Sequence, residues 1–202
     1  MLSAGVFHKR LNNFIYRRVT EVDSYGGVDF DRTVELRQEV NGELATLTGV
    51  EVAYQQNLTF LPGALKGLGV YGNLTYTASN ATLTDRSGVG ETETITLPGQ
   101  APLVGNLSLS YDYKGFNTRI SANYADDYIL ELGDEADEDL FVNNRLQLDW
   151  TASYQIGSRF TVFAEFMNLN NAPFETYVGS EETFIQREFY SWWSRAGLKF
   201  NL

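Results

Sequence analysis

The stretch RLQLDWTASYQI, residues 145–156, alternates between polar and apolar side chains from end to end. Its apolar set consists of Leu146, Leu148, Trp150, Ala152, Tyr154 and Ile156. Successive side chains of a β-strand point to opposite faces of a sheet, so this period of two residues predicts a strand. Such a strand has one apolar and one polar face, and the fold depends on whether the apolar face meets a protein core or lipid.

The same alternation runs through most of the chain and predicts an all-β protein. Eight strands are expected, at residues 2–20, 34–60, 68–80, 103–113, 116–127, 142–156, 159–170 and 185–202, with a bulge or break near Asn41-Gly42. Short connections at 61–67, 114–115 and 157–158 alternate with long ones at 21–33, 81–102, 128–141 and 171–184. This rhythm is typical of an antiparallel up-and-down barrel with tight turns at one end and large loops at the other.

The composition limits the function classes. The 202 residues fit a single barrel domain, 1–202, and contain no run of about 18 apolar residues that would form a membrane-spanning helix. A net charge of −11 argues against a nucleic-acid partner, which requires a basic surface. There is no cysteine and one histidine, His8, so neither thiol chemistry nor a histidine metal cluster is expected. Asp126, Asp127 and Arg119 lack a supporting nucleophile, and we expect no enzymatic activity, cofactor or metal.

Three features favour a transmembrane barrel over a soluble one. The polar face carries Asn, Ser, Thr and Gln, aromatic residues stand at strand ends, and charges concentrate in the long connections. The residues expected to face lipid are Leu146, Leu148, Trp150, Tyr154, Ile156, Leu198, Phe200 and Leu202. The polar residues expected in the interior, where they are free to pair across strands, are Arg119, Arg145, Asp149, Glu165 and Arg195. A soluble barrel that binds a small apolar ligand, as lipocalins do, is the alternative.

The long connections hold most of the residues expected to contact a ligand. These residues are Asp134, Glu135, Asp137, Glu138 and Asp139 in the acidic run 131–140, together with Trp193. Carboxylate oxygens suit Ca²⁺, but the run lacks the spacing of an EF-hand, and a solvated loop explains it more simply. Tyr190 and Trp192 fit an aromatic belt at the membrane surface, whereas Trp193 points to the opposite face of the strand.

Five stretches resemble the C-terminal end of the barrel of a TonB-dependent outer-membrane receptor. The strongest is NGELATLTGVEVAYQQNLTFLPGALKGLGVYGNLTYTAS, residues 41–79, with its GVE strand, LPG turn and N-x-T-Y strand. LPGQAPLVGNLSLSYDYKGFNTRISANYADDY, 97–128, resembles the following hairpin, and FAEFMNLNNAPFETYVG, 163–179, resembles the N-L-x-N strand near the end. SAGVFHKRLNNFIYRRV, 3–19, and RAGLKFNL, 195–202, resemble the opening and closing strands of this region. The similarity therefore runs through the whole chain.

This resemblance implies a transporter that takes up a scarce ligand, such as a siderophore, cobalamin or an oligosaccharide, across the outer membrane of a Gram-negative bacterium. The implied partners are outer-membrane lipid, the barrel-assembly machinery, which reads the terminal G-L-x-F strand, and TonB. We expect TonB to be reached through an N-terminal plug, which this sequence lacks. The family barrel has about twenty-two strands, of which these eight correspond to the last. A stand-alone eight-strand outer-membrane protein with a structural or adhesive role is a second alternative.

Overall fold

A computed structural model describes residues 1–84, 86 and 92–200 of the protein. The described chain is built almost entirely of antiparallel strands, with two short 3-10 helices, η1 (Gly63–Gly67) and η2 (Ala136–Glu138). No helix within the described ranges is long and apolar enough to cross a membrane. The all-β prediction is confirmed.

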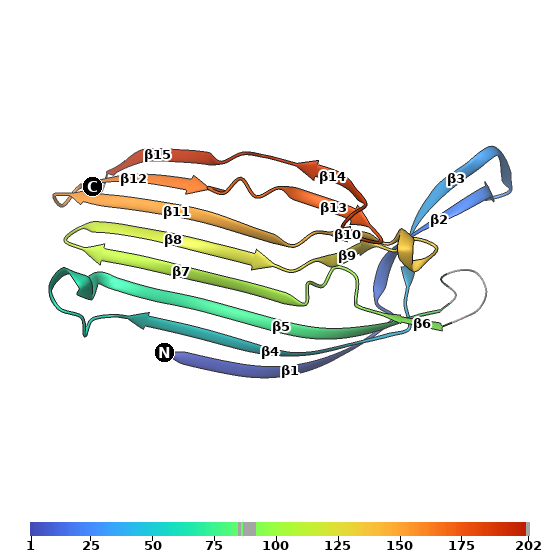
Figure 1. The fold of residues 1–202 in the computed structure, drawn as a ribbon, viewed down its shortest axis with the longest axis horizontal. Helices are drawn as coiled ribbons and strands as arrows, with labels where there is room; N and C mark the ends of the chain where they lie inside the picture. Colours follow the sequence, from blue (N-terminus) through green and yellow to red (C-terminus); the bar gives the residue numbers. More distant parts are fainter. Residues whose placement is uncertain (85, 87–91, 201–202) are drawn as a thin grey trace.

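The main sheet contains the eight long strands that the alternation predicts. In spatial order they are β1 (Leu2–Asn12), β4 (Leu44–Asn57), β5 (Leu68–Thr84), β7 (Leu103–Tyr113), β8 (Phe116–Ala125), β11 (Arg145–Ile156), β12 (Phe160–Met167) and β15 (Trp193–Phe200). A ninth, short strand, β6 (Thr92–Ile95), pairs with the end of β5. Within the described residues β1 pairs with β4 alone and β15 with β12 alone, so the two edges of the sheet are not joined. Figure 1 shows the tight turns and both termini at one end of the sheet and the long connections at the other.

The chain leaves the main sheet between β1 and β4, where the sequence predicted two continuous strands. Residues 15–41 instead form a separate two-stranded hairpin, β2 (Ile15–Tyr25) and β3 (Val28–Asn41), which projects from the loop end (Figure 1). The predicted break near Asn41-Gly42 is confirmed. Gly42 lies against the ring of Phe14, and a Cβ atom there would stand 2.2 Å from Phe14 Cζ, so only a glycine fits this corner.

All four predicted long loops contain strand residues, so their interpretation as plain loops was wrong: 21–33 lies in the hairpin, and 81–102 contains β6. The other two, 128–141 and 171–184, are themselves folded. They form a second, four-stranded sheet in the order β14 (Phe184–Glu188), β13 (Phe174–Val178), β10 (Leu140–Val142) and β9 (Tyr128–Glu131). The predicted strand 185–202 is accordingly divided between β14 and β15. These added strands are only three to five residues long. So short a run carries too little alternation to stand out from a loop.

The register aligns apolar residues in rows across neighbouring strands of the main sheet. One row runs through Val70, Leu109, Ile120, Trp150 and Phe166 on five neighbouring strands. Leu109, Ile120 and Trp150 in this row are exposed, so the described residues leave this face of the sheet uncovered there.

The opposite face of the main sheet is polar, and its side chains bond from strand to strand. Asn106 donates to Asn73 at 2.9 Å, the hydroxyls of Ser108 and Ser121 are 2.9 Å apart, and Asn123 donates to Asp149 at 3.0 Å. The two faces of the sheet therefore differ sharply in chemistry, as the sequence alternation requires.

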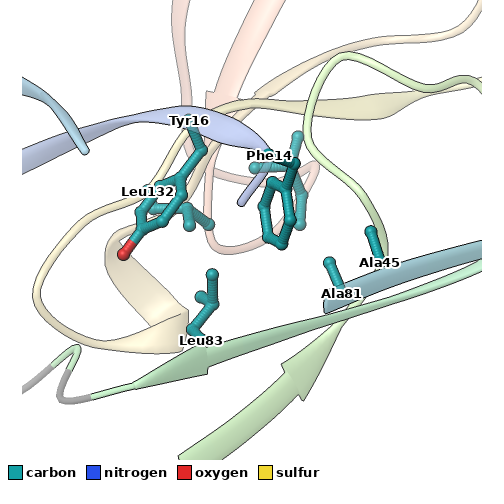
Figure 2. Packing of buried hydrophobic residues seen from close by; sticks show 7 residues of the cluster. Phe14, Tyr16, Ala45, Ala81, Leu83 and Leu132 are labelled. Atoms are coloured by element: carbon teal, nitrogen blue, oxygen red, sulfur yellow. The ribbon is translucent and has the colours of Figure 1, made fainter. Parts of the chain in front are cut away.

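The buried apolar core lies at the loop end. It consists of Phe14, Tyr16, Ala45, Ala81, Leu83, Ile129 and Leu132. These side chains come from the base of the hairpin, the extensions of β4 and β5, and the segment of β9, and Figure 2 shows them converging. The loop segments are thus fixed to the sheet by a hydrophobic core of their own.

Candidate ligand-facing site at the loop end

The β2–β3 hairpin docks on the segment that follows β9. Val19 donates its backbone N–H to the Leu132 carbonyl at 2.9 Å, and Leu132 donates to the Arg17 carbonyl at 3.2 Å. The Leu132 side chain is fully buried beneath this contact. Two connections more than a hundred residues apart in sequence thus form one surface.

A network of ion pairs spans the hairpin and β9. Glu131, nearly buried, accepts hydrogen bonds from Arg17 and Arg37, each at 3.1 Å. Arg17 also donates to Glu39 at 2.9 Å, and Arg37 to Glu35 at 3.2 Å. The hydrogen bonds to Glu39 and Glu131 raise the pKa of the Arg17 guanidinium above its ordinary value. Both arginines are therefore already neutralised by carboxylates of the protein.

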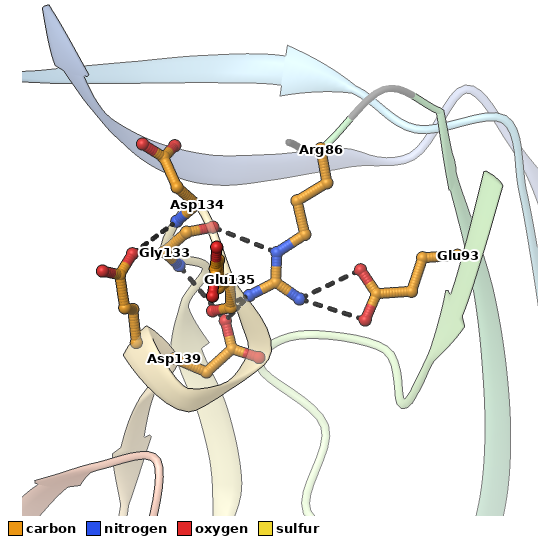
Figure 3. Close-up of polar contacts among 7 residues, drawn as sticks. Arg86, Glu93, Gly133, Asp134, Glu135 and Asp139 are labelled. Atoms are coloured by element: carbon orange, nitrogen blue, oxygen red, sulfur yellow. Dashed lines mark hydrogen bonds and ion pairs between the residues drawn. The ribbon is translucent and has the colours of Figure 1, made fainter. Parts of the chain in front are cut away.

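A second polar centre is built around the buried guanidinium of Arg86, between the β5–β6 connection and the turn that contains η2 (Figure 3). Arg86 donates to both carboxylate oxygens of Glu93, at 3.1 and 3.2 Å, and to the carbonyls of Gly133 at 3.0 Å and Glu135 at 2.6 Å. It also pairs with Asp139, which in turn accepts the backbone N–H of Gly133 at 3.1 Å. Burial raises the pKa of the Asp139 carboxyl to about 6 against the opposing effect of Arg86.

Between the hairpin and the four-stranded sheet lies a half-open cavity of about 250 Å³. The polar residues of its lining include Glu21, Glu35, Arg37, Asp134 and Glu138, and the apolar residues include Val19, Leu132, Leu140, Val178 and Ile185. A small concave site with an apolar wall and a few converging polar groups is the usual form of a ligand-binding pocket. Among the described residues no group of three His, Cys, Asp or Glu side chains is arranged to hold a metal ion.

The predicted loop contacts separate into three groups. Asp134 and Glu138 line the cavity. Glu135 and Asp137 are exposed beside it. Asp139 is buried and bound to Arg86, so its role is to hold the turn together.

Trp193 stands apart from the cavity. It lies on the polar face of β15, opposite Met167, with 54% of its surface exposed. Asp126 and Asp127 accept the hydroxyls of Tyr124 and Tyr177, at 3.1 and 2.6 Å, which gives both carboxylates a structural use.

Sequence reasoning missed the two arginines that organise this end, Arg37 and Arg86. Each stands in a mixed polar stretch without a motif, and its partners Glu131 and Asp139 are distant in sequence. Nothing in the local pattern distinguishes a buried arginine from a solvated one.

The residues predicted for the barrel interior lie on the polar face. Arg195 and Glu165 are directly opposite on β15 and β12 and form a salt bridge at 2.5 Å. Asp149 accepts from Gln147 at 2.8 Å and from the backbone N–H of Asn168 at 2.9 Å. Arg145 donates to the Ala172 carbonyl at 3.3 Å, and Arg119 lies opposite Ser110 and Thr151.

The residues predicted to face lipid share the other face. Leu146, Trp150, Tyr154, Ile156, Leu198 and Phe200 are exposed there, and Leu148 is half-buried. Leu202 lies outside the described residues. Contact with lipid itself stays a prediction.

The main sheet has one apolar and one polar face, tight turns at one end and packed loop segments at the other, which are the features of a segment of an outer-membrane type of β-barrel. Residues 1–169 match the family described as TonB dependent receptor-like, beta-barrel, and the chain belongs to that family. The resemblance seen in the sequence is thereby confirmed. A comparison with curated proteins gives no match. The family consists of outer-membrane receptors and transporters that interact with TonB, and this chain is a barrel portion of such a protein.

Proposed function

We propose that this chain forms the C-terminal part of the barrel of a TonB-dependent receptor, which imports a scarce ligand such as a siderophore, cobalamin or an oligosaccharide with energy supplied through TonB. The observation that carries the proposal is the family match over residues 1–169. It is supported by the main sheet, whose connections are short at one end and long at the other (Figure 1). In outer-membrane barrels the short turns face the periplasm and the long connections face outward. The loop end of this chain, with its cavity, then faces the external ligand.

The two faces of the main sheet support a membrane position. Large apolar side chains such as Leu107, Leu146 and Leu198 are about half exposed on one face. Exposure to water on this scale is unfavourable, whereas contact with lipid chains removes the cost. The polar face, with its ion pair Arg195–Glu165, suits the hydrated interior of a barrel.

The unjoined edges support a larger barrel over a closed eight-strand one. Each unpaired backbone group of β1 or β15 in hydrocarbon would cost several kcal/mol, so both edges must find partner strands in the membrane. Further strands of the same receptor would satisfy them. We assign β15 to recognition by the barrel-assembly machinery, on the resemblance of its G-L-x-F sequence.

Orientation is tested by cysteine labelling, which the absence of cysteine from this chain makes direct. Glu181→Cys lies between β13 and β14 at the loop end, and Ser158→Cys lies in the tight turn between β11 and β12. On intact cells a membrane-impermeant maleimide should label the first variant and spare the second, and lysis should expose both. The opposite pattern would invert the proposed topology.

Energy-coupled transport is tested by uptake. Cells that carry the intact gene and cells in which it is disrupted are compared for uptake of a labelled ferric siderophore, cobalamin and an oligosaccharide. We expect one uptake activity to disappear on disruption, to return with the wild-type gene and to stop when a protonophore is added. Uptake that persists with the protonophore would remove TonB coupling from the proposal.

A further inference from the structure

We propose that the cavity between the β2–β3 hairpin and the four-stranded sheet binds an organic cation, an ammonium or guanidinium group carried on an apolar stem. The inference rests on the proposed function and specifies the ligand class of the same loop-end site.

Charge in this chain is divided between its two ends. The segments 13–43, 81–102, 126–144 and 168–192, which connect the long strands at the loop end, contain 22 of the 26 acidic residues and 6 of the 15 basic ones. The remainder of the chain therefore has more basic than acidic residues. A surface of one sign concentrates ligands of the opposite sign and speeds their capture. The loop end attracts cations and repels anions.

Three carboxylates in the cavity wall have no cationic partner among the described residues. Glu138 accepts only the backbone N–H of Asp134, at 3.2 Å, and Asp134 accepts that of Glu21, at 3.4 Å. The carboxylate of Glu21 has no partner within the described part of the chain. All three side chains line the same cavity. They leave it with negative charge that no residue in the described ranges neutralises.

Arg37, the one arginine among the described residues that line the cavity, does not convert it into an anion site. Arg37 is held by Glu131 at 3.1 Å and by Glu35 at 3.2 Å, so its charge is already balanced. An incoming carboxylate or phosphate would compete with two protein carboxylates and meet the unneutralised ones nearby. This arrangement disfavours an anionic ligand.

The apolar residues of the lining determine the kind of cation. Val19, Leu140, Val178 and Ile185 give the cavity an apolar surface, which suits a hydrocarbon or aromatic stem. A bare metal ion requires several oxygen ligands converging on one point. The described acidic side chains form no such group. A volume of about 250 Å³ accommodates one cationic substituent with part of its stem.

The test is a binding measurement on the whole protein purified from outer membranes in a neutral detergent. The probe is dansylcadaverine, an ammonium on an aliphatic stem, followed by fluorescence anisotropy. The reference probe is N-pentyl dansylamide, which has the same aromatic body and aliphatic stem without the ammonium. We expect dansylcadaverine to bind roughly tenfold or more tightly than this neutral probe, the factor expected for one hydrogen bond to a charged group. Equal binding of the two probes would overturn the proposal.

Matched double variants separate the cavity from the general charge of the loop end. Asp134→Asn with Glu138→Gln keeps an acceptor oxygen at both positions and should weaken dansylcadaverine binding roughly tenfold or more. Glu181→Gln with Glu182→Gln removes the same charge from an exposed turn outside the cavity and should change binding less than twofold. Equal losses in the two variants would overturn the assignment to the cavity. The assay involves neither TonB nor transport, so its failure would leave the uptake test of the proposed function unaffected.

Discussion

The ring of Phe163 lies over the backbone of Gly197, its directly opposite residue across the β12–β15 pair. A Cβ atom at Gly197 would stand 2.7 Å from two ring carbons, so the ring can hold this position only against a glycine. Arg195 and Lys199 flank the same ring, 5.9 and 5.1 Å from its centroid. An aromatic ring that covers a glycine on the neighbouring strand fixes the register of the pair, here at the edge strand of the sheet.

Replacing this glycine should loosen the last strand. In Gly197→Ala the Phe163 ring must move away, which sacrifices its contacts with both cations, and we expect a loss of about 1 kcal/mol in the free energy of unfolding. Gly5→Ala is the matched control, since a Cβ atom on that strand glycine meets no atom within 4 Å. The stability of both variants is measured by heat-dependent gel migration of the receptor taken from outer membranes. Equal shifts of the two variants would contradict a specific ring–glycine contact.

The Arg86 centre should control the order of the turn that contains η2. Arg86→Met leaves the Asp139 carboxylate buried without its cation, which we expect to destabilise the turn by about 3–5 kcal/mol. Proteolysis within residues 131–139 should then become faster, whereas Arg32→Met, at an exposed position of β3, should leave it unchanged. Adding Asp139→Leu to Arg86→Met removes the unpaired charge and should restore part of the protection. A cleavage rate unaffected by Arg86→Met would show that the contacts of Arg86 do not order this turn.

Titration of Asp139 gives this turn a pH dependence with a definite sign. Its folded pKa of about 6 lies above the ordinary value of 3.8, so the folded state binds the proton more tightly than the unfolded state. The resulting stabilisation is complete below about pH 4 and is lost as the pH rises through about 6, with an upper size of roughly 3 kcal/mol. Hydrogen exchange at the Gly133 amide, corrected for its intrinsic rate, should be more protected at pH 5 than at pH 7. Asp139→Asn should flatten this difference, and a wild-type profile already flat would refute the assignment.

The eight long strands were predictable because each one has an apolar face and a polar face. A strand such as β11 repeats its apolar and polar sets over twelve residues, which is enough for the period to be unmistakable. The same property makes the face of each residue predictable, and Leu146 and Gln147 indeed lie on opposite faces.

The loop end was not predictable, because its structure arises from contacts between distant segments. The backbone of Leu132 bonds to β2, more than a hundred residues away, and Arg86 joins two connections whose sequences give no sign of each other. Strands as short as β10 have no periodicity to read. Local pattern therefore identifies the strands of the main sheet, while the arrangement of the loop end requires the tertiary structure.

Asn170 provides a test of how the chain leaves β12. Its side-chain amide bonds to β11 as the backbone of a paired strand would. It accepts a hydrogen bond from the N–H of Leu148 at 2.9 Å and donates one to the carbonyl of Leu146 at 2.6 Å. Asn170→Ala removes both bonds, and we expect a loss of about 1–2 kcal/mol in stability. Asn80→Ala, at an exposed asparagine of β5 for which the described contacts show no side-chain hydrogen bond, is the control. A loss from Asn80→Ala as large as that from Asn170→Ala would argue against this role.

The lipid assignment of the apolar face is tested by placing one charge on each side of the same strand. Leu148 and Ser153 lie on opposite faces of β11, well inside the main sheet. In Leu148→Arg the guanidinium would enter hydrocarbon at a cost of about 2–4 kcal/mol near the middle of the bilayer. In Ser153→Arg it would enter the polar interior, where carboxylates such as Asp149 and Glu165 share its face. The amount of folded receptor in outer membranes, read from heat-modifiable migration, should therefore fall for Leu148→Arg and stay near wild type for Ser153→Arg. The reverse order would place protein against the Leu148 face and lead back to a soluble barrel.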